Sequence, residues 1–222
     1  MKNKIIILGL VAAAFVLRTP AALADKISPE GQKLITAIDA MHVEKYWLAG
    51  AQVDWRSGEP NGKVYAVPNG HTHCSAFAAA TAEKLGVYLL RPPEHSAMLL
   101  ANAQQIWLCG AGTNGGWVAV STPLEAQKLA NAGNLVLVTC KNPDPTKPGH
   151  IAIVRPSEKS DEKIAAEGPE VTQAGLHNYI HTNVKEGFKN HKDAFEKNEL
   201  LYFVHPLAWS KLAELQKPSH DN

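Results

Sequence analysis

The sequence lacks several features that would assign it at once to a functional class. Its 222 residues carry 22 lysines and arginines against 21 acidic residues, so the basic excess typical of nucleic-acid-binding proteins is missing. It has neither the glycine period of collagen nor an internal repeat. A hydrophobic share of 45% excludes a disordered polar chain, and the length suffices to bury a core without disulfide staples. The composition therefore predicts one ordinary globular domain.

The first residues have the pattern of a secretory signal peptide. Two lysines precede an apolar run over residues 5–17, and Ala22-Leu23-Ala24 forms a small-residue cleavage site. The alternative, a membrane anchor, is disfavoured because the run is too short for a hydrocarbon core of about 30 Å. We predict a signal peptide over 1–24 and a single exported domain over 25–222, periplasmic or secreted. After cleavage neither a membrane nor a nucleic acid is expected as a partner.

Export changes the interpretation of the three cysteines, because an oxidising compartment permits disulfides. Cys109 lies in a glycine-rich loop and Cys140 ends an apolar run. These two could form a bridge if their Cα atoms came within about 7 Å of each other. Cys74 could be a half-cystine or a small buried residue, but its neighbours are typical of a chemical role.

The hydrophobic pattern alternates between helical and strand-like segments, with helices first and strands after, which predicts an α+β fold. Capping signals at Ser28 and Thr122 each precede a proline and open a helix. Residues 50–70 and 157–163 are predicted as loops, and 185–197 as a solvated amphipathic segment. Further helices are predicted over 73–86, 96–108 and 207–215, and strands over 135–140, 150–154, 170–174 and 200–204.

The predicted helix over 73–86 places Cys74 at its N-terminus. Unpaired N–H groups and the helix dipole there lower a thiol pKa and can bind an oxyanion, so Cys74 is the candidate nucleophile. Pro148-Gly149 delivers His150 to a strand start, where a rigid sheet would hold a general base. Gln173 on the next strand could orient that imidazole. Asn178 and Glu170 remain open as weaker candidates for this third role.

Several motifs, taken in their order, resemble the papain-like cell-wall peptidases of the NlpC and CHAP type. The run His73-Cys74-Ser75-Ala76-Phe77, followed by Leu85-Gly86-Val87 and Arg91-Pro92, is similar to the segment that opens the family's catalytic helix. The segments 133–138, 149–154 and 171–174 resemble its subsequent strands, the last two carrying its histidine and third polar residue. The chain departs from the family in having His73 before the cysteine, Asn134 in place of an acid, and an amide as third residue.

The resemblance implies a papain-like fold, with a helical N-terminal half packed on an antiparallel sheet. It also implies hydrolysis of an amide bond in peptidoglycan peptides, with no cofactor and no metal. Tyr65, Trp117 and His73 are the candidate substrate-binding residues, although Tyr65 could simply pack on the sheet and Trp117 could be core. The sequence leaves open which bond is cut, and whether the cell wall attacked is the producer's own or a competitor's. It also leaves open whether an inhibitor or immunity protein is a further partner.

Two other functions compete with this hypothesis. A catalytically silent cell-envelope binding module would keep the fold while Cys74 was locked in a disulfide or far from His150. A zinc protein could use the cluster His71, His73 and Cys74, because imidazole and thiolate are zinc ligands. The spacing offers no second ligand pair, so the hydrolase is the preferred interpretation.

Overall fold

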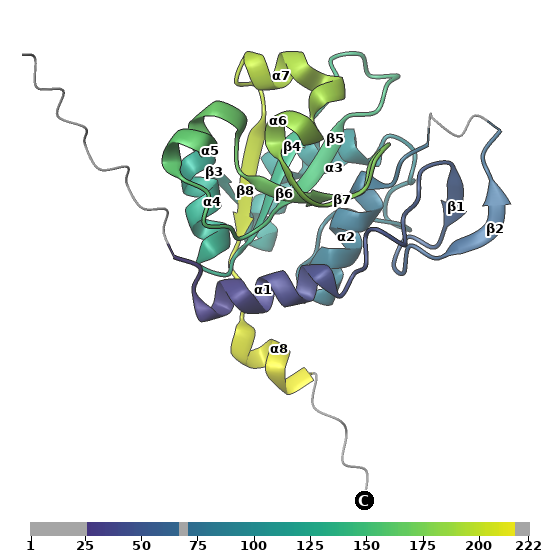
Figure 1. The fold of residues 1–222 in the computed structure, drawn as a ribbon. Helices are drawn as coiled ribbons and strands as arrows, with labels where there is room; N and C mark the ends of the chain where they lie inside the picture. The colour runs from purple at the N-terminus through teal and green to yellow at the C-terminus, as the bar shows by residue number, and fades with distance from the viewer. Residues whose placement is uncertain (1–25, 67–70, 216–222) are drawn as a thin grey trace, which may run out of the picture.

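The structure, a computed structural model, describes residues 26–66 and 71–215 and defines an α+β protein (Figure 1). The predicted signal peptide lies outside the described residues. Within the described ranges, no helix is long and apolar enough to cross a membrane.

The helices are distributed along the whole chain. They are α1 (Pro29–Asp39), α2 (Cys74–Lys84), α3 (Leu100–Cys109), α4 (Pro123–Asn131), α5 (Asp161–Glu167), α6 (Val184–Gly187), α7 (Lys192–Glu196) and α8 (Trp209–Leu215), with the 3-10 turns η2 (Ala111–Gly115) and η3 (Lys189–His191). The strands are β1 (Ala51–Val53), β2 (Pro60–Val64), β3 (Val118–Val120), β4 (Leu135–Cys140), β5 (His150–Val154), β6 (Glu170–Gln173), β7 (Tyr179–Asn183) and β8 (Leu201–His205).

One six-stranded sheet organises the molecule, in the order β3-β8-β4-β5-β6-β7, and all its recorded pairs are antiparallel. In the β4–β5 pair, Cys140 lies opposite His150. The β5–β6 register joins Ile153 to Thr172 and Val154 to Val171. The start of β5 therefore lies at the same end of the sheet as the end of β6. This brings His150 and Gln173 together.

Alternate residues of the central strands serve two separate cores, as the two-residue period of a strand requires. Leu135, Leu137 and Ile151 pack with the buried face of α2. Val136 and Val138 pack with residues of α4 and α6 on the other side. Strand β4 is buried along its whole length, which explains its continuous apolar sequence.

Local signals placed several elements correctly. Ser28 caps α1 by accepting from Gly31 N–H, and Thr122 caps α4 by accepting from Glu125 N–H. An ion pair ties α1 to the end of β5: the buried guanidinium of Arg155 donates to both carboxylate oxygens of the exposed Asp39 at 2.6 and 2.9 Å. Burial of an arginine requires such pairing.

Other expectations were wrong. Residues 50–70 were expected to be a loop but contain the β1–β2 hairpin, and the charged 157–163 segment continues into α5, which Ser160 caps. Helix α3 begins at Leu100 rather than at residue 96. The helices α5 to α8 follow the first strands of the sheet, so they are not confined to an N-terminal half. The edge strand β7 was missed because its residues are half-exposed and polar.

Candidate active site

Cys74 is the first residue of α2, as predicted, and it is a free thiol in the described structure. Its side chain is 4% exposed within a helix whose first nine residues are all buried. Burial raises the pKa of the Cys74 thiol, while backbone N–H groups of Ile151, Ser75 and Cys74 itself and the Thr72 hydroxyl act in the opposite direction. The expected lowering of this pKa was therefore wrong for the structure described, because desolvation exceeds the effect of the helix N-terminus.

The effect of Ile151 N–H on the pKa of the Cys74 thiol indicates that this N–H lies near the sulfur. Ile151 is the second residue of β5 and directly follows His150. The Cys74 sulfur therefore lies beside the start of the strand that carries the candidate base. Among the described interactions, no hydrogen bond joins this sulfur to the His150 ring.

The loop that leads to His150 is fixed by two asparagines. Asn102 on α3 donates through Nδ2 to the Lys147 carbonyl at 2.9 Å and accepts from Asn142 N–H at 3.0 Å. Asn142 in turn donates to the Pro148 carbonyl at 3.1 Å. Both ends of the loop are thereby tied to α3. Neither asparagine could be recognised from the sequence, because their partners are remote groups.

Gly149 is the last residue of the loop before His150. Replacing it with alanine should lower the stability of the protein and disturb the geometry of the site. A Cβ there would collide with the Cys140 carbonyl oxygen and stand 2.5 Å from Asn102 Oδ1. Because a backbone oxygen cannot move aside freely, we expect Gly149→Ala to lower the free energy of unfolding by about 1–3 kcal/mol, measured by urea denaturation. The control is Gly110→Ala, whose Cβ would meet its nearest atom at 3.6 Å. Equal stability of the two variants would contradict the prediction.

Gln173 is hydrogen-bonded to His150. Its Oε1 lies 2.9 Å from His150 Nε2, and both side chains are buried. An amide oxygen accepts only, so the ring carries its proton on Nε2 and keeps the Nδ1 lone pair. Burial lowers the pKa of His150, and the hydrogen bond with Gln173 acts against that shift. The neutral imidazole thus keeps one ring nitrogen, Nδ1, that can accept a proton.

The other candidates for the third role have different partners. Asn178 donates to the carbonyls of Val43 and Tyr46 at 2.6 and 2.9 Å, and accepts from Gly175 N–H. It therefore ties the β6–β7 turn to the segment after α1. Glu170 lies 3.3 Å from the exposed His181.

A cover over His150 comes from the segment that was predicted to be solvated. Phe188, fully buried after α6, packs edge-on against the His150 ring at 4.7 Å, and His191 of η3 lies parallel to that ring at 6.2 Å. A Cβ on Gly187 would approach Gln173 Oε1 at 2.6 Å. One signal for this cover was present in the sequence: an aromatic residue follows a glycine inside a charged stretch.

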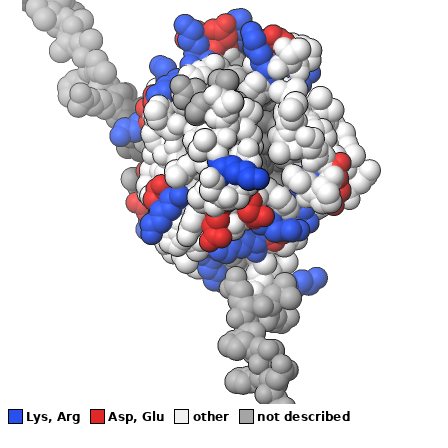
Figure 2. Space-filling model, turned by 90° about the vertical axis from the view of Figure 1, so that its right-hand side faces the viewer, with Lys and Arg blue, Asp and Glu red and all other residues white. Residues whose placement is uncertain are grey.

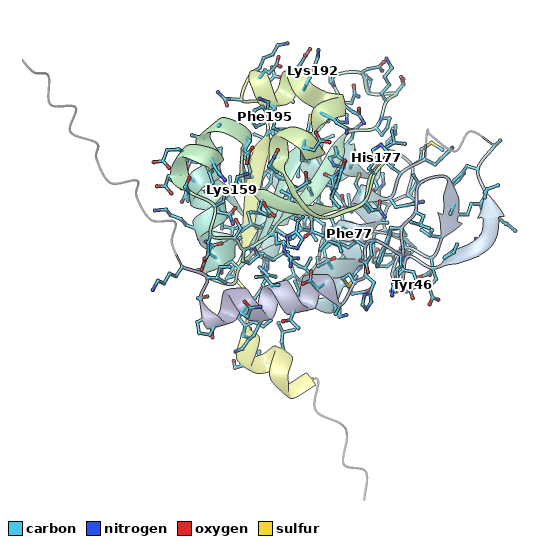
Figure 3. The ribbon with its side chains drawn as sticks, viewed as in Figure 1. Tyr46, Phe77, Lys159, His177, Lys192 and Phe195 are labelled. Carbon is cyan, nitrogen blue, oxygen red and sulfur yellow. The ribbon has the colours of Figure 1, made fainter. Side chains whose placement is uncertain are left out.

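A pocket of about 330 Å³ opens beside the imidazole. Its lining includes Thr72, His150, Gln173, His177 and His191, so it extends from the residue beside Cys74 to the cover. His177 is labelled in Figure 3 on the turn that precedes β7. Cys74 itself does not line the pocket, which is consistent with its burial.

The candidate substrate-binding residues lie in different environments. Tyr65 stacks on His71 with ring centroids 3.7 Å apart. His73 is buried, and its Nε2 lies 2.8 Å from the Ala51 carbonyl, which holds the β1–β2 hairpin to the start of α2. Trp117 is 1% exposed and donates to the Tyr88 carbonyl, so it belongs to the core, the second of the two roles considered for it.

The cluster His71, His73 and Cys74 does not converge on a shared point. Each side chain has a different partner: the Tyr65 ring, the Ala51 carbonyl and the start of β5. Across residues 26–66 and 71–215, no group of three potential metal ligands is found.

Cys109 is exposed and Cys140 buried, and both are free thiols, so they do not form the disulfide considered from the sequence.

Three buried or half-buried histidines should make folding sensitive to mild acid. Burial lowers the pKa values of His73, His150 and His191. Below about pH 6.5 the unfolded chain takes up these protons first, so stability falls as the pH falls. We expect a lower free energy of unfolding at about pH 5.5 than at about pH 7.5 in urea denaturation. His191→Gln should flatten this dependence and the exposed-site control His181→Gln should not. A stability independent of pH over this range would contradict the prediction.

The comparisons with known proteins assign no relative. No protein-family model matches the chain, and no curated protein matches its sequence.

Proposed function

We propose that the protein is an exported cysteine amidase or endopeptidase of papain-like type that hydrolyses an amide bond in peptidoglycan peptides. One observation supports this above all: a thiol at a helix N-terminus is held against the start of the strand whose first residue is an imidazole fixed by an amide. Nucleophile, base and orienting group are thus on three rigid elements, α2, β5 and β6. That is the arrangement that thiol acyl transfer requires.

In the proposed mechanism, His150 acts from its neutral form. Its Nδ1 takes the proton of the Cys74 thiol while Nε2–H stays bound to Gln173. The thiolate attacks the substrate carbonyl, His150 then protonates the leaving amine, and water hydrolyses the resulting acyl-enzyme. Gln173 carries no charge, so it orients the imidazolium without neutralising it.

The backbone N–H groups near the thiol suggest how the oxyanion is held. The N–H groups of Ile151, Ser75 and Cys74 act to lower the pKa of the thiol, so they lie close to the sulfur. When the thiol turns to His150, the Cys74 N–H becomes free to donate to the oxygen of the tetrahedral intermediate. Access must come through the pocket beside Thr72, because the sulfur itself is covered.

The proposed substrate class and cellular localisation are supported by the sequence alone. The resemblance to the NlpC and CHAP type implies cell-wall peptide as the substrate, and the N-terminal pattern favours the periplasm or the exterior. The charges fit this proposal: Figure 2 shows basic and acidic side chains intermixed at the upper and lower margins of one face, with one basic side chain and otherwise mostly uncharged surface between them. Such a face offers no basic patch for a polyanion.

The alternative is a cell-envelope binding module that keeps the fold without catalysis. The burial of the Cys74 thiol and its lack of a hydrogen bond to His150 favour this alternative. Its other predicted feature, a disulfide at Cys74, does not occur in the described structure.

One assay distinguishes the hydrolase from the binding module. Purified peptidoglycan is incubated with the protein, and soluble products are identified by mass spectrometry. Hydrolysis should release peptides that gain the mass of one water and carry a new amino group for each bond cut. Binding to the insoluble polymer without any such product would reject the enzyme and support the module; neither binding nor products would reject both.

A further inference from the structure

A second and larger pocket lies away from the imidazole. Its volume is about 660 Å³, and it shares no lining residue with the pocket beside His150. The end of α3 forms one wall, β3 and the start of α4 another, and the α7–β8 segment closes it. Phe195, labelled on α7 in Figure 3, belongs to this third wall. None of the residues proposed to carry out hydrolysis lines this pocket.

The chemistry of the lining is uniform. Its residues are Leu108, Cys109, Thr113, Ala119, Val120, Ser121, Pro123, Phe195, Asn198, Leu200, Leu201, Tyr202 and Phe203. None of them carries a formal charge, and most are apolar. A volume between about 300 and 1,000 Å³, an apolar wall and a few polar groups are the usual features of small-molecule sites. The lining therefore favours an uncharged ligand.

Tyr202 supplies an independent indication of a ligand. Its side chain is 6% exposed, and its hydroxyl makes no hydrogen bond among the described residues. Other buried polar aromatics do have partners, such as Trp47 with the Trp55 carbonyl and Trp117 with the Tyr88 carbonyl. The Tyr202 phenol therefore keeps a hydrogen-bond donor that no described residue uses.

The position of this hydroxyl points to the pocket. In the described residues, fully enclosed side-chain polar atoms without partners occur at Gln104, Gln105 and Ser157, and not at Tyr202. The Tyr202 hydroxyl therefore reaches open space, and the space that Tyr202 lines is this pocket. An acceptor atom placed there would satisfy the phenol.

We propose that this pocket binds an uncharged, mainly apolar small molecule whose carbonyl or ether oxygen accepts a hydrogen bond from Tyr202. The apolar body of the ligand would lie against Leu108, Val120 and Phe195. The inference does not depend on the proposed hydrolase function, because it uses other residues and another pocket.

The test uses 6-propionyl-2-(dimethylamino)naphthalene, an uncharged aromatic ketone whose fluorescence reports both polarity and hydrogen bonding to its carbonyl. We expect saturable binding to the wild-type protein with one site. Tyr202→Phe keeps the ring and removes only the donor, so it should weaken binding by about fivefold to tenfold. The variant should fold as stably as the wild type, because the lost hydroxyl has no partner to leave unsatisfied. Thermal unfolding checks this.

Cys109 provides a second, independent measurement. It lines the pocket and is exposed, whereas Cys74 and Cys140 are buried, so a maleimide should label Cys109 selectively, as mass spectrometry can verify. The attached group should occupy the pocket and abolish binding of the ketone. Cys109→Ser treated with the same reagent is the control and should still bind. No saturable binding, or binding that survives both Tyr202→Phe and alkylation of Cys109, would overturn the proposal.

Discussion

Replacement of Cys74 by serine should reduce kcat/KM for amide hydrolysis by at least about 10³-fold. A serine hydroxyl is a much poorer nucleophile at neutral pH, and an uncharged imidazole held only by an amide is a weak base for activating it. His150→Gln should cause a loss of similar size, because no other residue of the pocket offers a proton-accepting nitrogen at the position of the His150 ring. Activity is measured as release of amino groups from peptidoglycan peptides.

The matched control for the histidine is His181→Gln. His181 lies on β7 in the same half of the sheet, but it is exposed and outside the pocket lining. It should retain wild-type activity. The double variant Cys74→Ser with His150→Gln should be little worse than either single variant, because the two groups act as one unit. Independent, additive losses would indicate that the two residues do not cooperate, and the proposed mechanism would fail.

The sequence predicted the parts of this site that depend on local signals. Proline and capping residues located α1 and α4, and the continuous apolar run located β4 with its bounds. The Pro-Gly pair before His150 marked the start of β5 correctly. Gln173 was placed correctly on the following strand, β6. Each of these features acts over a few residues.

The remaining features depend on contacts between distant segments. Desolvation of Cys74 follows from the packing of α2 against β5, which no local pattern reveals, and so the direction of its pKa shift was wrong. The cover by Phe188 and His191 lies in a stretch whose charges are typical of a solvated surface. Asn102 holds a loop about forty residues away along the chain, through an amide that is indistinguishable in sequence from a surface asparagine.

Changing Gln173 should alter both the rate and its pH dependence. Gln173→Ala leaves the His150 ring without its orienting acceptor, so kcat/KM should fall at least about tenfold. Gln173→Glu keeps an acceptor but places a negative charge against the ring, which raises the pKa of His150. The base then stays protonated to higher pH. The acidic limb of the pH–rate profile, which burial of His150 places below about pH 6.5 in the wild type, should move upward.

Gly187 allows the same hydrogen bond to be tested without changing either partner. A Cβ at this position would stand 2.6 Å from Gln173 Oε1, so Gly187→Ala should displace the amide from His150. We expect a fall in kcat/KM close to that of Gln173→Ala. The acidic limb of the pH–rate profile should not move upward. Gly115→Ala, whose Cβ would meet its nearest atom at 3.7 Å, should stay near wild type. If Gln173→Glu left the acidic limb unchanged while Gly187→Ala kept full activity, Gln173 would have no part in orienting the base. The amide would then serve only to pack the end of β6 beneath α6.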